Sequence, residues 1–143
     1  MYVVSACLIG KNCRYNGGNS RDDRVLELLK DKEYIDVCPE ELGGLTTPRQ
    51  PNEIVDGRVV DKSGNDVTEF FLKGALETYE AAIRKSMEVN QPIEMAILKA
   101  RSPSCGSGKI YDGTFTGKQI DGNGITSELL IKNGIKVITE EDL

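Results

Sequence analysis

The chain contains no histidine and no tryptophan among its 143 residues. Without histidine, neither a Ser-His-Asp nor a Cys-His catalytic arrangement can form. Zinc sites that use imidazole and the usual general base near neutral pH are excluded for the same reason. Any proton transfer must therefore use carboxylates, lysine, tyrosine, cysteine or water.

Long apolar runs and an excess of basic residues are also lacking. No segment approaches the roughly 20 apolar residues of a membrane span, and the first residues lack the features of a signal peptide. The formal net charge is −5, which disfavours binding to a phosphate backbone. We expect a cytoplasmic protein with no membrane and no nucleic-acid partner, although a small anionic substrate remains compatible with a locally positive cleft.

Apolar periodicity predicts one α/β domain spanning residues 1–143. Short buried strands are expected at residues 2–6, 34–37, 93–98 and 135–138. Helices are expected at 22–32, 67–89 and 125–133, and small hairpins at 54–60 and 110–116 with Asp-Gly turns. This order is typical of a Rossmann-like three-layer sandwich with a mainly parallel sheet of about four strands plus β-hairpin insertions.

The longest predicted helix carries one apolar stripe at near-helical spacing. Its members are Leu72, Leu76, Tyr79, Ile83 and Met87, and it is widened by Phe71, Ala75 and Ala82. The pattern predicts that this stripe faces the hydrophobic core.

Three of the four cysteines follow predicted strands: Cys7, Cys38 and, after a short turn, Cys105. Ligands of open α/β sheets gather outside the carboxyl ends of the strands, so these thiols should converge. Structural disulfides are rare in a reducing compartment, so these cysteines indicate metal or thiol chemistry instead. The absence of a CxxC pair argues against a thioredoxin-like or zinc-ribbon motif. A zinc site made of these three cysteines and Cys13 is possible, but the four do not occur in the closely spaced pairs that are usual for structural zinc. Three thiolates in one crevice would suit an iron–sulfur cluster with one iron left open.

Polar residues accompany these thiols. Glu40 lies two residues after Cys38 and could act as a general base. Ser102 and Ser104 offer hydroxyl donors beside Cys105. We expect substrate or anion contacts from Arg14, Tyr15, Asn16, Arg49, Lys99, Arg101 and Ser104.

The same stretches resemble the thiouracil desulfurase family of bacteria. The matching segments are VSACLIG (4–10), CRYNGG (13–18), CPE (38–40), GGL (43–45), PR (48–49) and KARSPSCG (99–106). The resemblance implies a [4Fe–4S] cluster held by Cys7, Cys38 and Cys105, whose open fourth iron would bind the sulfur of the substrate and keep it. It also implies hydrolysis of the C=S group of a thiolated nucleobase to C=O without net redox change. Glu40 would assist water or substrate protonation, and Ser102 would contact substrate or cluster.

Cys13 and Asn16 differ from the other residues of these segments. Cys13 lies in the loop after the first strand rather than at a strand end, and members of this family often carry another residue there, so we interpret it as an accessory thiol outside the ligand set. Asn16 stands where the family pattern has aspartate. Asn16 can hydrogen-bond, but the substitution removes the basis for an acid or base role.

Other functions stay open from the residues alone. A sulfur-trafficking protein could use the same cluster or a reactive thiol, and a metal- or ligand-binding module, including a zinc form, needs no turnover. A carrier should tolerate Glu40→Gln, whereas an enzyme that depends on this carboxylate should not. Whether the chain forms a homodimer is also left open.

Overall fold

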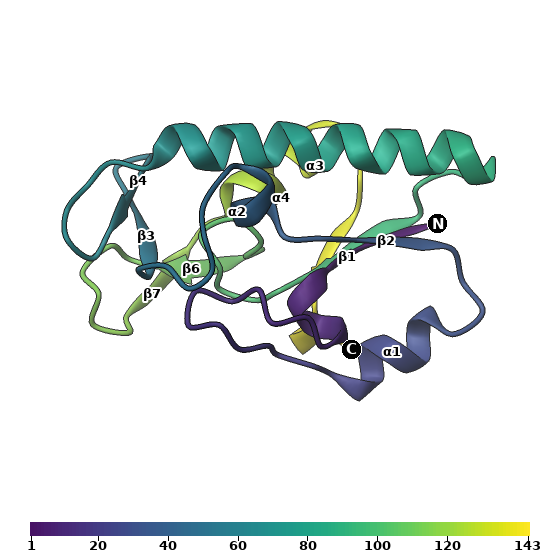
Figure 1. The fold of residues 1–143 in the computed structure, drawn as a ribbon, viewed down its shortest axis with the longest axis horizontal. Helices are drawn as coiled ribbons and strands as arrows, with labels where there is room; N and C mark the ends of the chain where they lie inside the picture. Colours follow the sequence, from purple (N-terminus) through teal and green to yellow (C-terminus); the bar gives the residue numbers. More distant parts are fainter.

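The computed structural model describes residues 1–143 and has a central sheet of four parallel strands in the order β2-β1-β5-β8. The strands are β1 (Tyr2–Ser5), β2 (Tyr34–Val37), β5 (Met95–Leu98) and β8 (Val137–Thr139). The helices are α1 (Asp23–Leu29), α2 (Pro39–Leu42), α3 (Thr68–Val89) and α4 (Ile125–Lys132), with 3₁₀ turns η1 (Ala6–Ile9) and η2 (Glu140–Asp142). Figure 1 shows α3 and α1 on opposite sides of the sheet. The predicted three-layer α/β fold is confirmed.

Alternation of side chains along β1 explains why both faces of the sheet are apolar. Val3 packs in a core cluster with Ala82 of α3 and Leu130 of α4. Val4, the next residue, packs on the other face with Val25 and Leu29 of α1. Neighbouring strand residues point to opposite faces, so a strand covered on both sides is apolar at every position.

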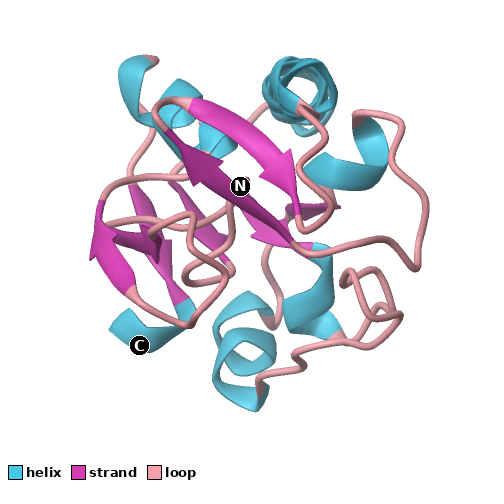
Figure 2. Cartoon of the chain, turned by 90° about the vertical axis from the view of Figure 1, so that its left-hand side faces the viewer, coloured by secondary structure: helices cyan, strands magenta, loops and turns pink.

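The order of the strands places a crevice at their carboxyl ends. β1 is flanked by β2 on one side and β5 on the other, which is the point where the direction of the crossovers changes and where such sheets bind ligands. Two hairpins lie at this end, which faces the viewer in Figure 2. They are β3 (Asn52–Val55) with β4 (Arg58–Asp61), and β6 (Lys109–Tyr111) with β7 (Gln119–Asp121).

The carboxylate of Glu53 joins the two hairpins. Its Oε1 accepts hydrogen bonds from the backbone N–H groups of Gly113 (3.0 Å) and Phe115 (3.1 Å). The first hairpin turns at Asp56 and Gly57, both with positive φ, as the sequence predicts. The second does not turn at Gly113: Tyr111 pairs with Gln119, so the predicted return strand at 114–116 is wrong.

Residues 39–42, expected in irregular structure, form the short helix α2. Pro39 occupies its first turn, where the missing N–H costs no hydrogen bond. The two glycines and two prolines that follow within residues 43–51 indicate a loop, and they obscure the single helical turn before it.

The prediction for the buried face of α3 is confirmed for Phe71, Ala75 and Ala82, which are buried, and wrong for the exposed leucines of the stripe. The residues of α3 that are buried are mostly small: Thr68, Phe71, Gly74, Ala75, Thr78 and Ala82. In the predicted core stripe, Leu72 is 48%, Leu76 53% and Met87 76% exposed. None of the helices combines the length and hydropathy that a membrane-spanning segment requires.

The close approach of α2 and α3 explains why α3 buries mostly small residues. A Cβ on Gly74 would lie 1.9 Å from the carbonyl oxygen of Pro39, and a Cβ on Gly43 would lie 1.9 Å from that of Phe70. The two backbones therefore touch at both glycines, and larger residues would separate them. Because α2 directly follows Cys38 and contains Glu40, this contact positions residues of the crevice.

We predict that Gly74→Ala destabilises the protein by about 1–3 kcal/mol through overpacking. In an unhindered helix the same change is stabilising by about 1 kcal/mol, so the sign of the effect identifies the backbone contact. Ala81→Gly on the same helix is the control, with a loss of about 1 kcal/mol from helix propensity alone. Urea denaturation measures both. A Gly74→Ala variant as stable as the parent protein would contradict the contact.

Candidate active site at the carboxyl ends of the strands

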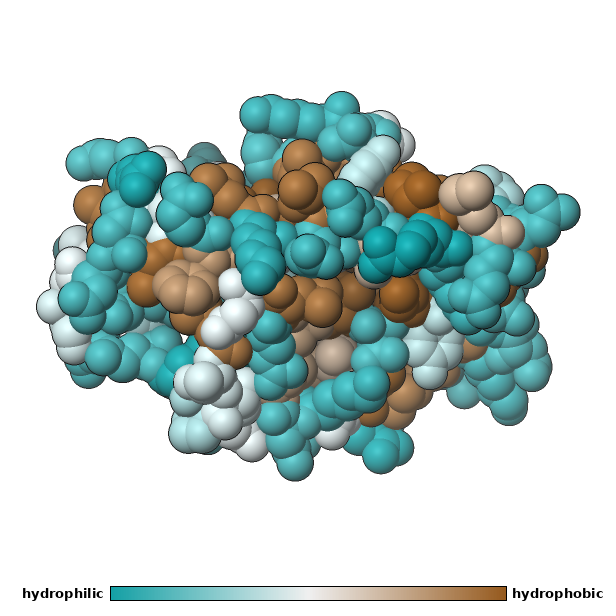
Figure 3. Space-filling model, turned by 45° about the horizontal axis from the view of Figure 1, so that its top comes forward, coloured by the Kyte–Doolittle hydropathy of each residue, from teal (hydrophilic) through white to brown (hydrophobic).

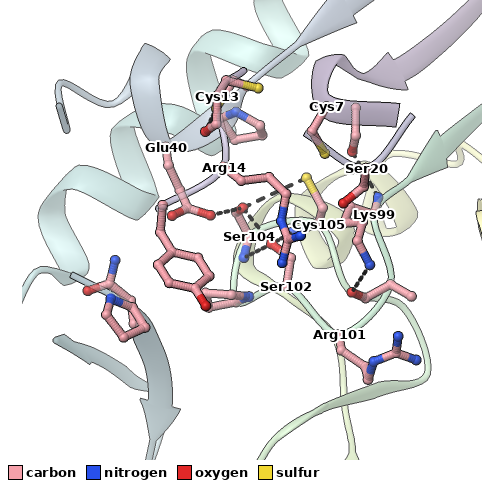
Figure 4. Close-up of a pocket in the computed structure, with 18 of the residues that line it drawn as sticks. Cys7, Cys13, Arg14, Ser20, Glu40, Lys99, Arg101, Ser102, Ser104 and Cys105 are labelled. Carbon is pink, nitrogen blue, oxygen red and sulfur yellow. Dashed lines mark hydrogen bonds between the residues drawn. The ribbon is translucent and has the colours of Figure 1, made fainter. Parts of the chain in front are cut away.

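All four cysteines line one cavity of about 640 Å³ at the carboxyl ends of the sheet. Cys7 comes from η1 directly after β1, Cys38 follows β2, and Cys105 lies in the turn after β5. Cys13 comes from the long loop between η1 and α1. Figure 4 shows Cys7 and Cys105 beside each other, with Cys13 and Glu40 on the neighbouring wall. The structure thus brings together thiols that are up to 98 positions apart.

The thiols contact one another as well as the cavity. All four are free, and only Cys38 is not fully buried. The Cys38 thiol donates to the backbone carbonyl of Cys13 at 3.7 Å. Cys7, Cys13 and Cys38 pack together in one cluster, and the first and last of them both affect the pKa of the Cys13 thiol.

The pKa values of three of these thiols, Cys13, Cys38 and Cys105, are raised, which favours their neutral form. Burial raises the pKa of Cys105 to about 12, although hydrogen bonds with Ser5 and Ser104 favour the thiolate. For Cys13, the hydrogen bond with Cys38 lowers the pKa, but the bond with Cys7 and burial together raise it to about 11. The hydrogen bond with Cys13 and burial raise the pKa of Cys38. Ionising them together requires a compensating positive charge, which a bound metal supplies.

The cavity brings together thiols that could hold a metal centre. No group of three or more cysteine, aspartate or glutamate side chains is arranged to hold one metal ion. In an iron–sulfur cluster each thiolate binds a different iron, so the sulfurs surround the cluster instead of converging on one point. Cys7, Cys38 and Cys105, one from each of three strand ends, fit that requirement.

A chain of hydrogen bonds leads to the carboxylate of Glu40. The Ser104 hydroxyl donates to Glu40 Oε2 at 2.9 Å, and the hydroxyl oxygens of Ser102 and Ser104 are 2.9 Å apart. Because the single hydroxyl hydrogen of Ser104 is directed to the carboxylate, Ser102 must be the donor to Ser104. The order is therefore Ser102 to Ser104 to Glu40, as Figure 4 shows.

Ser102 also shapes the turn that carries Cys105. Its hydroxyl oxygen accepts hydrogen bonds from the N–H groups of Ser104 (3.1 Å) and Cys105 (3.0 Å). Arg101, just before it, has a positive φ of 64°. Ser102 was predicted as a catalytic residue, and the structure adds that it fixes the position of Cys105.

Arg49 positions Glu40 and leaves little capacity for a ligand. Its side chain is only 7% exposed, and its Nε donates to Glu40 Oε1 at 3.0 Å. Its Nη groups donate to the Cys13 carbonyl (2.8 Å), to the Thr47 hydroxyl (2.7 Å) and to the Thr46 carbonyl (3.2 Å). Arg49 was predicted to contact substrate, but the structure commits its donors to the protein.

Two other predicted cations are also paired with carboxylates. Lys99 Nζ lies 2.9 Å from Glu140 Oε2. Arg101 lies 2.7 Å from Glu141, and this hydrogen bond raises the pKa of the guanidinium.

Arg14 forms no ion pair within the chain. Its guanidinium instead lies 5.8 Å from the centre of the Tyr15 ring, which makes it the predicted cation best placed to meet a ligand.

Asn16 is the one predicted site residue outside the cavity. It is exposed, and its side-chain oxygen accepts from the N–H of Gly18 at 2.9 Å, so it folds the loop instead.

Sequence reasoning missed several lining residues, the most constrained being Glu140. This buried carboxylate also accepts from the N–H of Ala100 at 2.7 Å. The sequence feature that could have identified Glu140 is its position directly after the fourth strand, at the same edge of the sheet as the cysteines. Others missed include Ser20, Glu53, Tyr111 and Phe115, which come from loops and hairpins.

The comparisons with known proteins agree with one another. The family model described as 2-thiouracil desulfurase matches residues 2–142. The uncharacterized protein YbbK of Bacillus subtilis (strain 168) is 44% identical over 153 residues, covering 100% of this chain and 97% of the relative. A solved structure described as the [4Fe-4S]-dependent thiouracil desulfidase TudS is 41% identical. It superposes with a TM-score of 0.85, covering 99% of this chain and 91% of that chain.

We predict that Arg49→Met lowers the free energy of unfolding by about 3–5 kcal/mol, because Glu40 is left buried without its partner. The matched control is Arg58→Met, which removes the exposed ion pair with Asp66 and should cost at most about 1 kcal/mol. Denaturation of both cluster-free variants under reducing conditions measures the difference. Equal losses would show that Arg49 does not have the positioning role described here.

Proposed function

Because the chain belongs to the 2-thiouracil desulfurase family, we propose that it is a [4Fe–4S]-dependent enzyme that converts the C=S group of a small thiolated nucleobase to C=O. It is an enzyme of the desulfidase type, in line with the name of the TudS structure. The observation that carries the proposal is the single cavity lined by Cys7, Cys38 and Cys105 together with Glu40. A structural metal site has no need of the carboxylate and hydroxyl groups found there.

We assign the cluster to Cys7, Cys38 and Cys105. These three thiols reach one cavity from three different strand ends, so their thiolates could each bind a different iron of one cluster. When bound through three cysteines, the cluster supplies one iron without a protein ligand, a Lewis acid for the thiocarbonyl sulfur. Cys13 lies against two of these thiols and remains an accessory thiol in this assignment.

The remaining steps belong to the side chains. Water adds to the thiocarbonyl carbon and Glu40 accepts its proton, so that the C–S bond breaks as the new C=O bond forms. The sulfur leaves as hydrosulfide and no electrons are gained or lost. Arg49 keeps the Glu40 carboxylate in place, and the Ser102–Ser104 hydroxyl chain gives its proton a route towards the departing group.

The walls farther from the thiols suit a planar, polar base. Tyr15 and Phe115 offer aromatic faces on the cavity lining, and stacking on such rings is general for nucleobases. Arg14 can donate to a carbonyl oxygen or ring nitrogen of the base. Lys99 and Arg101 are already paired with carboxylates, so they contribute to the electrostatic potential of the cavity more than to direct contacts with the base.

Anaerobic reconstitution with iron and sulfide tests the ligand assignment. We expect a broad cluster absorbance with about four irons per chain. Cys7→Ser, Cys38→Ser and Cys105→Ser should each lose it, whereas Cys13→Ser should retain it. Loss of the cluster only in Cys13→Ser, or in none of the four, would refute the assignment.

Glu40→Gln tests the role of the carboxylate. With the cluster content unchanged, we expect turnover of 2-thiouracil, followed by its ultraviolet absorbance, to fall by about 100-fold or more. Arg58→Met, far from the thiols on β4, serves as the control with parental activity. Full turnover of 2-thiouracil by Glu40→Gln would contradict the role of Glu40 as general base. A parent protein that binds sulfur but does not turn over 2-thiouracil would instead indicate sulfur trafficking.

A further inference from the structure

An apolar stripe runs along the outer surface of α3. Leu72, Leu76 and Ile83 are all more than a third exposed, and Tyr79 between them is half-buried. Figure 3 shows hydrophobic residues gathered along this side of the molecule. Exposed apolar patches of about 300–600 Å² are the largest that ordinary monomers carry and are often functional. This stripe borders the buried side of the helix: Tyr79 packs partly against the core cluster, whereas Leu72, Leu76 and Ile83 remain exposed.

The spacing of the stripe is that of a helix–helix seam. Successive members are four, three and four residues apart, which is the repeat that keeps a line of side chains facing a second helix. In an antiparallel pair of identical helices, residues whose numbers add to a constant lie opposite one another. With that constant at 155, Leu76 faces the partner's Tyr79 and Leu72 faces the partner's Ile83. All four positions of the seam are then filled by large apolar groups.

Charges beside the seam match the same register. Lys73 and Glu80 each follow a seam residue by one position, and in this register Lys73 lies close to the partner's Glu80. The twofold symmetry of such a pair repeats the contact, so the interface contains two opposite-charge pairs. Within the chain neither side chain takes part in any of the ten ion pairs. Both are exposed and free to pair across an interface.

We propose that two copies of this chain associate through α3 in an antiparallel, twofold-symmetric pair. A twofold interface requires one surface to be complementary to itself, and both the apolar seam and the Lys73–Glu80 pair satisfy that condition in a single register. No residue of α3 lines the catalytic cavity, so association leaves it open. The proposal is independent of the proposed chemistry.

The expected affinity is modest. α3 is 22 residues long, about 33 Å, and one helix pair of this length falls at or below the low end of specific interfaces, about 1,200 Å² in total. Interfaces of that size often correspond to dissociation constants in the micromolar range. The chain should therefore be a mixture of monomer and dimer at the concentrations used for purification.

Sedimentation equilibrium from about 5 µM to about 500 µM, a range that brackets this affinity, measures the association. We expect the mass to rise from 15.7 kDa towards twice that value. Leu76→Glu places two charges in the seam and should weaken the dimer by about 30-fold or more. The matched control is Ile120→Glu on β7, another apolar residue that is 46% exposed but lies off the stripe, and it should behave as the parent.

Charge reversal tests the register. Lys73→Glu alone and Glu80→Lys alone each place like charges opposite one another and should weaken self-association by about tenfold. An equimolar mixture of the two variants restores both opposite-charge pairs, so it should form a heterodimer of parental affinity. A monomeric parent at the highest concentration would overturn the proposal. So would a dimer that Leu76→Glu leaves intact, or a mixture that fails to associate.

Discussion

One buried guanidinium holds the candidate active site together. Arg49 joins the carboxylate of Glu40 on α2 to the carbonyl of Cys13 in the loop after β1. Through Glu40 and Ser104 the same network reaches the turn that carries Cys105. Three loops that leave three different strands are thus tied by hydrogen bonds to one side chain. A planar group with donors in a fixed fork is suited to this, because it satisfies several acceptors at once without rearranging.

The sequence indicates where the chemistry lies because strand ends can be recognised from apolar runs. β1, β2 and β5 end where the pattern places them, and the cysteines that follow them line one cavity. The Asp56–Gly57 turn is equally local, since an αL pair of this type specifies a tight hairpin. These features depend on neighbours in the chain, and local rules are sufficient for them.

Features that depend on distant contacts could not be predicted. Periodicity shows that α3 is amphipathic, but it cannot show that a face of Gly74, Ala75 and Ala82 is buried while the leucines remain outside. That choice depends on how closely α2 approaches. Likewise, nothing local separates Asn16, which folds its own loop, from Arg14 beside the cavity. The pairing of Lys99 with Glu140 joins residues 41 positions apart, a separation that no local pattern records.

The backbone contact between Gly43 and Gly74 has a consequence for how this protein can change over generations. Contacts made by side chains can be repacked, because a smaller residue on one side is offset by a larger one on the other. A contact between two main chains offers no such exchange, since each glycine meets a carbonyl oxygen that every residue carries. The inner side of α3 is therefore closed to larger residues at its point of contact with α2. Sequence drift in this helix is directed to its outer side, where changes of partner or of assembly can accumulate without disturbing the chemistry.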